Sequence, residues 1–95
     1  MKYQLLQIKK WEDCNYFFRG WDCAKKNHFT LSDYEVVYEG EIEGTDIPEV
    51  LEDLFRIFNI QQPKDFRGHS MSVSDVVCLD GKYYYADNIG FAEVK

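Results

Sequence analysis

The stretch "SDVVCLDGKYYYAD", residues 74–87, gives the strongest indication of how this chain folds. Its central pair, Asp80-Gly81, is favoured in two-residue type I′ turns, because both turn residues need a positive φ angle. The stretch therefore predicts a β-hairpin. Its first arm, residues 76–79, is apolar at every position, which is typical of a strand with both faces buried. We expect that arm to lie in the centre of an antiparallel sheet.

The stretch "TDIPEVLEDLFRIFNI" (45–60), before the hairpin, predicts the main helix. Asp46 and Glu49 have the spacing of an N-terminal capping box, and Pro48 falls in the first turn, where its missing N–H is not needed. Asn59 is expected to end the helix in the left-handed conformation, and Pro63 prevents its continuation. Residues at helical spacing form an apolar stripe that should be buried: Ile47, Val50, Leu51, Leu54, Phe55 and Phe58.

The stretch "DYEVVYEGEIE" (33–43) alternates apolar and charged residues, which predicts a strand with one buried and one solvated face. The buried face would carry Tyr34, Val36, Tyr38, Gly40 and Ile42. The solvated face would carry Asp33, Glu35, Glu39, Glu41 and Glu43, and Val37 does not fit the alternation. Glu39, Glu41 and Glu43 would then form a row with a spacing of about 6.6–6.8 Å.

Shorter patterns predict a strand over 2–10, an extended piece over 15–20, one or two helical turns over 21–27 and a short element over 91–94. A chain of 95 residues, 45% of them hydrophobic and 17% aromatic, is expected to form one domain over residues 1–95. The predicted fold class is α+β, an antiparallel sheet of about four or five strands with one main helix packed on one face.

No apolar run approaches the roughly 18 residues needed to span a bilayer, and the first ten residues lack the apolar core of a signal peptide. The three cysteines, Cys14, Cys23 and Cys78, have neither the even number of a disulfide framework nor the spacing of a zinc site. We therefore expect a cytoplasmic protein with reduced thiols, no membrane partner, no metal and no other cofactor.

The stretch "DFRGHSMSVSD" (65–75) concentrates polar chemistry before the central strand. Its candidate residues are Arg67, Gly68, His69, Ser70, Ser72, Ser74 and Asp75. A serine–histidine hydrolase is one interpretation, but the adjacent side chains of His69 and Ser70 diverge, and no G-x-S-x-G turn displays a serine. The favoured interpretation is structural, because hydroxyls and carboxylates readily bond the backbone of a long loop. We expect no catalytic residue.

The net charge of −6 is spread unevenly along the chain. Residues 1–26 hold six Lys or Arg against three acids, residues 27–55 hold nine acids and no Lys or Arg, and residues 56–95 balance five against five. The acidic middle disfavours direct nucleic-acid binding. The acids expected to form a partner-binding surface are Asp33, Glu35, Glu39, Glu41, Glu43, Glu49, Glu52 and Asp53. A merely solvated face is the competing interpretation.

The strings "RGHSMSVSDV" (67–76), "VYEGEI" (37–42) and "ADNIGF" (86–91), together with a helix that ends in Phe-Asn, resemble the YodL-like domain family. The resemblance is close over residues 34–94 and loose over residues 1–33. It implies a small α+β domain without an established enzymatic activity. It also implies an origin on conjugative elements, phages or chromosomes of Gram-positive bacteria. The chain departs from the family at 86–89, where Ala-Asp-Asn-Ile replaces a Val/Cys-Asp-Ser-Phe type of turn.

Three hypotheses about function follow. The first is a non-enzymatic protein-binding domain of a mobile element that inhibits a host defence nuclease, as an anti-CRISPR or anti-restriction protein. Its acidic strand and helix would dock into a basic groove of that partner. The second is a regulatory or scaffolding module that uses the loop 68–75. The third is a hydrolase that uses His69 and a serine. The sequence leaves the oligomeric state open.

Overall fold

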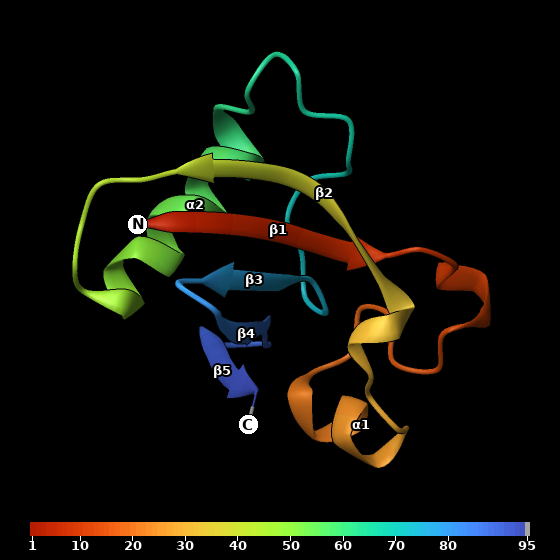
Figure 1. Ribbon diagram of the computed structural model, residues 1–95. Coiled ribbons are helices and arrows are strands. Elements are labelled where there is room, and N and C mark those ends of the chain that lie inside the picture. Colours follow the sequence, from red (N-terminus) through yellow and green to blue (C-terminus); the bar gives the residue numbers. More distant parts are fainter. Residues whose placement is uncertain (95) are drawn as a thin grey trace.

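The computed structural model describes residues 1–94 and contains one five-stranded antiparallel sheet (Figure 1). The strands are β1 (Lys2–Ile8), β2 (Tyr34–Glu41), β3 (Val76–Leu79), β4 (Lys82–Ala86) and β5 (Phe91–Val94), in the spatial order β2-β1-β3-β4-β5. The helices are α1 (Trp21–Lys26) and α2 (Ile47–Ile60), with 3-10 turns at Trp11–Asp13 and Leu31–Asp33. The predicted α+β class is confirmed, and β3 lies at the centre of the sheet as expected.

The β3–β4 turn forms as the sequence predicts. Asp80 and Gly81 both have positive φ angles, of 48° and 84°. Leu79 and Lys82 close the hairpin on either side of this pair.

Helix α2 covers one face of the sheet. The Asp46 side chain accepts a hydrogen bond from the Glu49 N–H at 3.2 Å, which caps the helix as predicted. Buried side chains of α2, β1, β3 and β4 form the first core with the loop after the helix: Tyr3, Leu5, Val50, Leu51, Leu54, Phe58, Phe66, Met71, Val77, Leu79 and Tyr84.

Two details of the predicted helix are wrong. Phe55 is 40% exposed, because it lies at the border of the core, where its ring packs edge-to-face with Phe91 at a centroid distance of 6.5 Å. Asn59 does not end the helix. Its side-chain amide donates to the Phe55 carbonyl at 2.7 Å, and the helix continues to Ile60.

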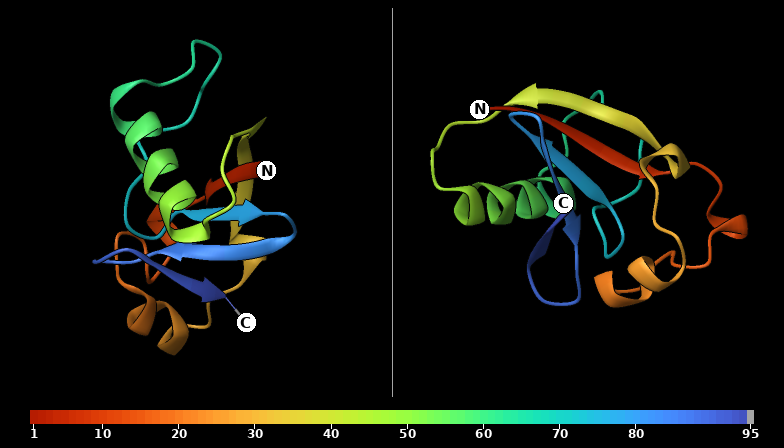
Figure 2. Two further views of the ribbon diagram at one scale, coloured as in Figure 1. Left: turned by 90° about the vertical axis from the view of Figure 1, so that its left-hand side faces the viewer. Right: turned by 60° about the horizontal axis from the view of Figure 1, so that its bottom comes forward.

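The N-terminal third covers the other face of the sheet with a second core. In the left view of Figure 2, α2 lies above the β4–β5 hairpin and α1 lies below it. The second core contains Leu6, Ile8, Tyr16, Ala24, Tyr34, Val76 and Tyr85. The extended piece predicted over 15–20 is wrong, because residues 15–18 form a turn closed by a hydrogen bond of 2.9 Å from the Arg19 N–H to the Tyr16 carbonyl.

Strand β2 contains a β-bulge at Val37. Tyr38 lies opposite Leu5 and Val36 lies opposite Leu6, so the residue between them has no partner in β1. Val36 and Tyr38 therefore point to opposite faces of the sheet, although they are two residues apart. The single buried face predicted for this strand is wrong, because Val36 is exposed whereas Tyr34 and Tyr38 pack on different cores.

The bulge also divides the acidic residues of β2. Glu35 faces one side of the sheet with its partner Gln7, whereas Glu39 and Glu41 face the other side with Gln4 and Lys2. The strand ends at Glu41, so Glu43 lies in the following loop. The predicted row of acids along one strand face is thus reduced to Glu39 and Glu41.

Candidate functional site

Gln7 in β1 organises the polar loop that precedes β3. It is buried, and its side-chain carbonyl accepts the His69 N–H at 3.1 Å. Its amide nitrogen donates to the His69 carbonyl at 2.8 Å and to Asp75 Oδ2 at 3.0 Å. A Cβ atom at Gly68 would lie 2.4 Å from Gln7 Oε1, so the loop can approach β1 only with glycine there. Sequence reasoning missed Gln7, and the single polar residue in "LLQI" (5–8) was its signal.

Asp75 is buried at the entrance to β3, with 1% of its surface exposed. Its main chain continues the hairpin ladder, since the Ala86 N–H donates to the Asp75 carbonyl at 2.8 Å. Oδ2 accepts from Gln7 and from the Ser72 N–H, both at 3.0 Å. Oδ1 has no hydrogen-bond partner within residues 1–94. Burial raises the pKa of Asp75 to about 7, although His69, the Ser72 N–H and Gln7 act in the opposite direction.

The His69 ring uses both of its nitrogens inside the protein. Nδ1 lies 2.7 Å from the Ser70 carbonyl, which can only accept, so we assign the proton of the neutral ring to Nδ1. Gln7 Nε2 lies 3.3 Å from the same nitrogen, but both of its hydrogens already have other acceptors. Nε2 then faces Asp75 Oδ1 at 3.8 Å.

None of the three serine hydroxyls is hydrogen-bonded to the His69 ring within the described chain. Ser70 Oγ lies 3.2 Å from the Gln62 side-chain amide, and Ser72 Oγ is buried without a partner there. Ser74 Oγ accepts the Phe18 N–H at 3.0 Å. The arrangement therefore lacks the serine–histidine contact that a hydrolase needs.

Ser74 joins the polar loop to the rest of the fold. It is fully buried with a φ angle of 85°, its N–H donates to the Ala86 carbonyl at 2.9 Å, and its carbonyl accepts the Tyr34 hydroxyl at 2.6 Å. These contacts fit the structural role expected of Ser74. Arg67 at the other end of the loop is exposed and forms no ion pair within residues 1–94.

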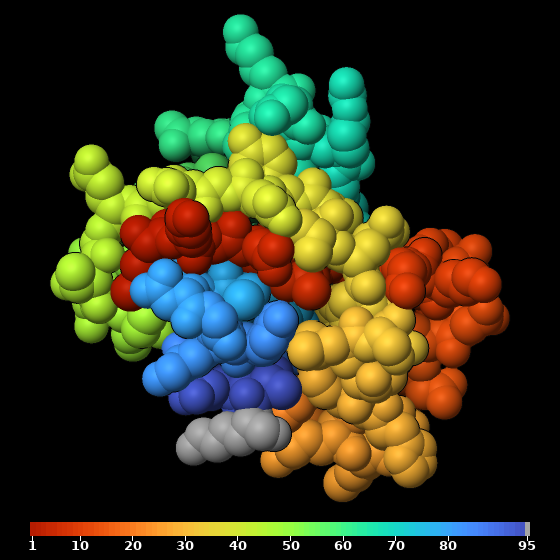
Figure 3. Space-filling model, in the orientation of Figure 1, coloured from red at the N-terminus to blue at the C-terminus, as the bar shows by residue number. Residues whose placement is uncertain are grey.

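Phe17 and Phe18 lie beside His69, and Trp11 packs on Phe17; we call these three residues the aromatic rim. Trp11 is 56% exposed and Phe18 is 55% exposed. Phe17 lies between them, with ring centroids 5.6 Å from Trp11 and 3.9 Å from Phe18. The His69 ring meets Phe17 and Phe18 edge-on at 6.3 and 6.5 Å. In Figure 3 the segment that follows β1 (orange-red) projects at one side of the molecule.

Phe18 combines exposure with an uncommon backbone conformation. Its φ angle is 63°, and Ser74 Oγ holds its N–H. The left-handed region is costly for a bulky residue that is not glycine. The aromatics in "NYFFRG" (15–20) are the sequence signal for Phe17 and Phe18, although their pattern predicts an extended piece.

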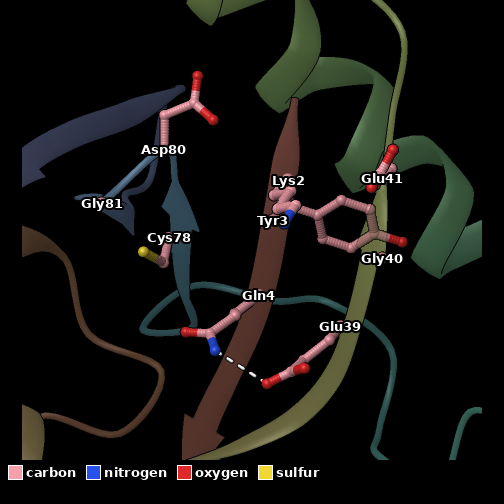
Figure 4. Close-up of a pocket in the computed structure, with 9 residues that line it drawn as sticks. All are labelled: Lys2, Tyr3, Gln4, Glu39, Gly40, Glu41, Cys78, Asp80 and Gly81. Atoms are coloured by element: carbon pink, nitrogen blue, oxygen red, sulfur yellow. Dashed lines mark hydrogen bonds between the residues drawn. The ribbon is translucent and has the colours of Figure 1, made fainter.

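The acids predicted to form one surface occupy separate places. Glu39 and Glu41 line a shallow hollow with Lys2, Cys78 and Asp80, and Glu39 accepts a hydrogen bond of 2.9 Å from the Gln4 amide (Figure 4). The other acids lie elsewhere. Glu35 lines a hollow beside His69, Asp33 accepts a hydrogen bond from the Tyr16 hydroxyl, and Glu43 lies in the loop after β2. The remaining three acids belong to α2: Glu49, Glu52 and Asp53, of which Asp53 forms an ion pair with Arg56 at 3.2 Å.

Two further features limit the classes of site that the described residues offer. Within residues 1–94, no helix is both long and apolar enough to cross a bilayer. The same part of the chain contains no group of three or more His, Cys, Asp or Glu residues placed to hold a metal ion.

The five-stranded antiparallel sheet, its one long helix and its buried polar loop define a small α+β domain. The model of the YodL-like domain matches residues 2–95, so the chain belongs to the YodL-like domain family. The match includes the first third of the chain, where the sequence resemblance was loose.

A curated relative, the uncharacterized protein YodL of Bacillus subtilis (strain 168), is 36% identical over 58 residues, which is 55% of this chain and 56% of the relative. The chain thus spans little more than half the length of that protein. No solved structure matches the chain at a significant level.

Proposed function

We propose that this chain is a non-catalytic protein-binding domain whose contact surface is the aromatic rim together with the loop 68–75. Phe18 carries the proposal. It is held by Ser74 in a costly backbone conformation, and it is left exposed. Strained residues and exposed aromatics are both features that folded proteins concentrate at functional surfaces.

The composition of this surface supports a role in binding. Aromatic residues dominate the energetic centres of protein interfaces, since they bury a large area with few rotatable bonds. Phe17 connects Trp11 and Phe18 into one patch, and His69 supports that patch from the loop. The same loop contains the residues that resemble the family, so the family motif and the rim form one unit.

The His69 ring supports a non-catalytic role. A general base needs a nitrogen within hydrogen-bond reach of the proton that it removes. Here Nδ1 faces the Ser70 carbonyl and Nε2 faces Asp75. The proposal places the domain in the cytoplasm, where the free thiols of Cys14, Cys23 and Cys78 stay reduced.

Tagged protein captures partners from a bacterial lysate, and a captured protein is then purified for affinity measurements. Phe18→Asn and Trp11→Ala should each weaken binding about tenfold or more, as loss of an interface centre does. Ile60→Ser is the matched control, because Ile60 is an exposed apolar residue on α2 outside the rim. Equal affinities for the wild type and both rim variants would reject this surface.

A second candidate function uses the acidic hollow. Glu39, Glu41 and Asp80 gather there around the single cation Lys2. In this proposal the domain comes from a mobile element, and the hollow docks onto the basic groove of a host defence nuclease, as an anti-CRISPR or anti-restriction inhibitor would. Charge complementarity of this kind mainly accelerates association.

The test of the second candidate is a triple variant, Glu39→Gln, Glu41→Gln and Asp80→Asn, measured at about 50 and 500 mM salt, where the screening length differs about threefold. Affinity should fall at low salt, the loss should shrink at high salt, and DNA or RNA should compete for the partner. The double variant Glu49→Gln and Glu52→Gln on α2 is the control. An unchanged association rate in the triple variant would reject docking through the hollow.

A further inference from the structure

We propose that His69 and Asp75 form a one-proton site beneath the aromatic rim, and that uptake of this proton tightens the contact between His69 and the rim. The inference adds regulation to the surface in the proposed function. The site itself is a property of the free protein and is tested without a partner.

The hydrogen-bond pattern leaves room for one proton. The neutral His69 ring carries its proton on Nδ1, which donates to the Ser70 carbonyl. The lone pair of Nε2 then faces the unpartnered Oδ1 of Asp75 across 3.8 Å. Two acceptors that face each other without a proton repel, whereas one added proton on either atom joins them. The pair therefore has a charge of −1 without this proton and zero with it.

The groups around the pair allow the proton to bind near neutral pH. Gln7 is uncharged, and its side-chain amide donates a hydrogen bond to Asp75 Oδ2. Burial raises the pKa of Tyr34, Tyr16 and Tyr85 above the ordinary value, so these neighbouring hydroxyls stay neutral. The side chain of Cys14 packs against the second core, which contains these three tyrosines.

Two charged residues, Glu35 and Arg67, face the same side of the sheet. They line the solvent-open hollow that also contains His69 and Gln7, and they have opposite signs. Burial raises the pKa of Asp75 to about 7, and the electrostatic effect of His69 acts in the opposite direction. The proton on the pair is therefore the main charge change beneath the rim in the physiological range.

Two short paths connect the pair to the rim. The His69 ring lies in an edge-to-face arrangement with Phe17 and Phe18, at centroid distances of 6.3 and 6.5 Å. Ser74, next to Asp75 in the chain, holds the Phe18 N–H. With the proton in place, Nε2 and Oδ1 attract and close toward the roughly 2.7–3.2 Å of a hydrogen bond. Without it, repulsion moves the ring outward, which loosens its contacts with both phenylalanines.

The test is an NMR titration of the free protein from pH 5 to pH 9. It follows the side-chain carboxyl carbon of Asp75, the ring nitrogens of His69 and the ring protons of Phe18. We expect the Asp75 carboxyl to titrate near neutral pH and the signals of His69 and Phe18 to follow the same transition, with the proton of the neutral His69 ring on Nδ1 at its alkaline end. The protein contains two histidines, so the His28→Asn variant identifies the His69 signals.

In the Asp75→Asn variant the common midpoint should be lost and the Phe18 signals should stop following His69, whereas His28→Asn should leave both unchanged. In the wild type, separate midpoints for Asp75 and His69 would overturn the proton site, because one proton shared by two groups gives one common transition. A Phe18 ring that is silent through the transition would overturn the coupling. Rim variants that keep full partner affinity would reject the contact surface and leave the proton site standing.

Discussion

Asp75 shows how one buried side chain links this fold to pH. Its pKa is about 7 in the folded protein and about 4 in an unfolded chain, so the folded state binds the proton more tightly. The stabilisation from this proton is complete below about pH 4 and is lost as the pH rises through 7. The contribution of Asp75 is thus opposite in sign to that of an aspartate in an ordinary salt bridge.

The Asp75→Asn variant tests this sign. The amide cannot ionise, so its free energy of unfolding should exceed that of the wild type by an amount that grows between about pH 4 and pH 7, to a few kcal/mol at most. Denaturant unfolding at several pH values measures the difference. Asp80→Asn is the control, because Asp80 is exposed and Asn-Gly also favours a type I′ turn. A constant difference across this range would contradict the buried, raised-pKa carboxyl.

Phe18 contributes little to stability in this fold despite its size. Phe18→Asn should change the free energy of unfolding by about 1 kcal/mol or less, because Asn tolerates the left-handed conformation and the phenyl ring is mostly exposed. Phe58→Ala, at a fully buried position, should cost about 3–5 kcal/mol. Thermal and denaturant unfolding compare the two variants. A cost for Phe18→Asn as large as that of Phe58→Ala would make Phe18 a core residue.

Neighbouring residues of helix α2 differ sharply in burial, since Leu54 is fully buried and Phe55 is 40% exposed. Leu54→Ala should cost about 2–5 kcal/mol, because Leu54 has no exposed surface. Phe55→Ala should cost about 1 kcal/mol or less, because Phe55 is 40% exposed. Urea unfolding measured by circular dichroism gives both values. Equal costs would show that the helix is rotated about its axis relative to this structure.

The sequence predicted those features that depend on neighbouring residues. The capping of α2 needs only Asp46 and Glu49, and the tight turn needs only Asp80 and Gly81. Helical spacing predicted the buried stripe, but it could not show where the β4–β5 hairpin leaves Phe55 uncovered. Period-two alternation predicted strand β2, but it did not predict which of its side chains lie on which face of the sheet. The bulge at Val37 lets Tyr34 and Tyr38 reach different cores, which is a tertiary requirement.

Only the loop residues of the candidate site could be predicted from the sequence. The residues 67–75 stood out by their chemistry, whereas Gln7 lies 62 residues away from His69 in the chain. Nothing near Gln7 in the sequence indicates that its amide will hold that loop. The strained conformation of Phe18 likewise depends on Ser74, which is 56 residues away. Contacts of this kind are set by sheet topology rather than by local pattern.

The first strand ties the whole molecule together. Strand β1 lies between β2 and β3, and it contributes Tyr3 and Leu5 to one core and Leu6 and Ile8 to the other. The resemblance to the family was clearest over residues 34–94, yet that region without β1 would lose the strand that joins β2 to the rest of the sheet.

A fragment of residues 34–95 should therefore be unfolded, with neither the circular dichroism of a sheet nor a cooperative thermal transition. Leu5 and Val76 are fully buried on opposite faces of the sheet, one in each core. Disruption of the sheet would therefore expose both cores together. Adding a synthetic peptide of residues 1–33 should restore some structure if the two parts assemble. A fragment that melts cooperatively by itself would show that the N-terminal third is a separate attachment.

The bulge in β2 also protects the molecule from its own copies. Strand β2 is an edge of the sheet, and an unpaired edge can recruit the same strand from another molecule into a growing fibril. The extra residue at Val37 breaks the regular spacing of backbone groups along that edge, and the flanking carboxylates repel a second copy. High salt screens the carboxylates, but the kink remains. Any precipitate formed at high salt should be amorphous, with no thioflavin signal, and it should redissolve when the salt is removed.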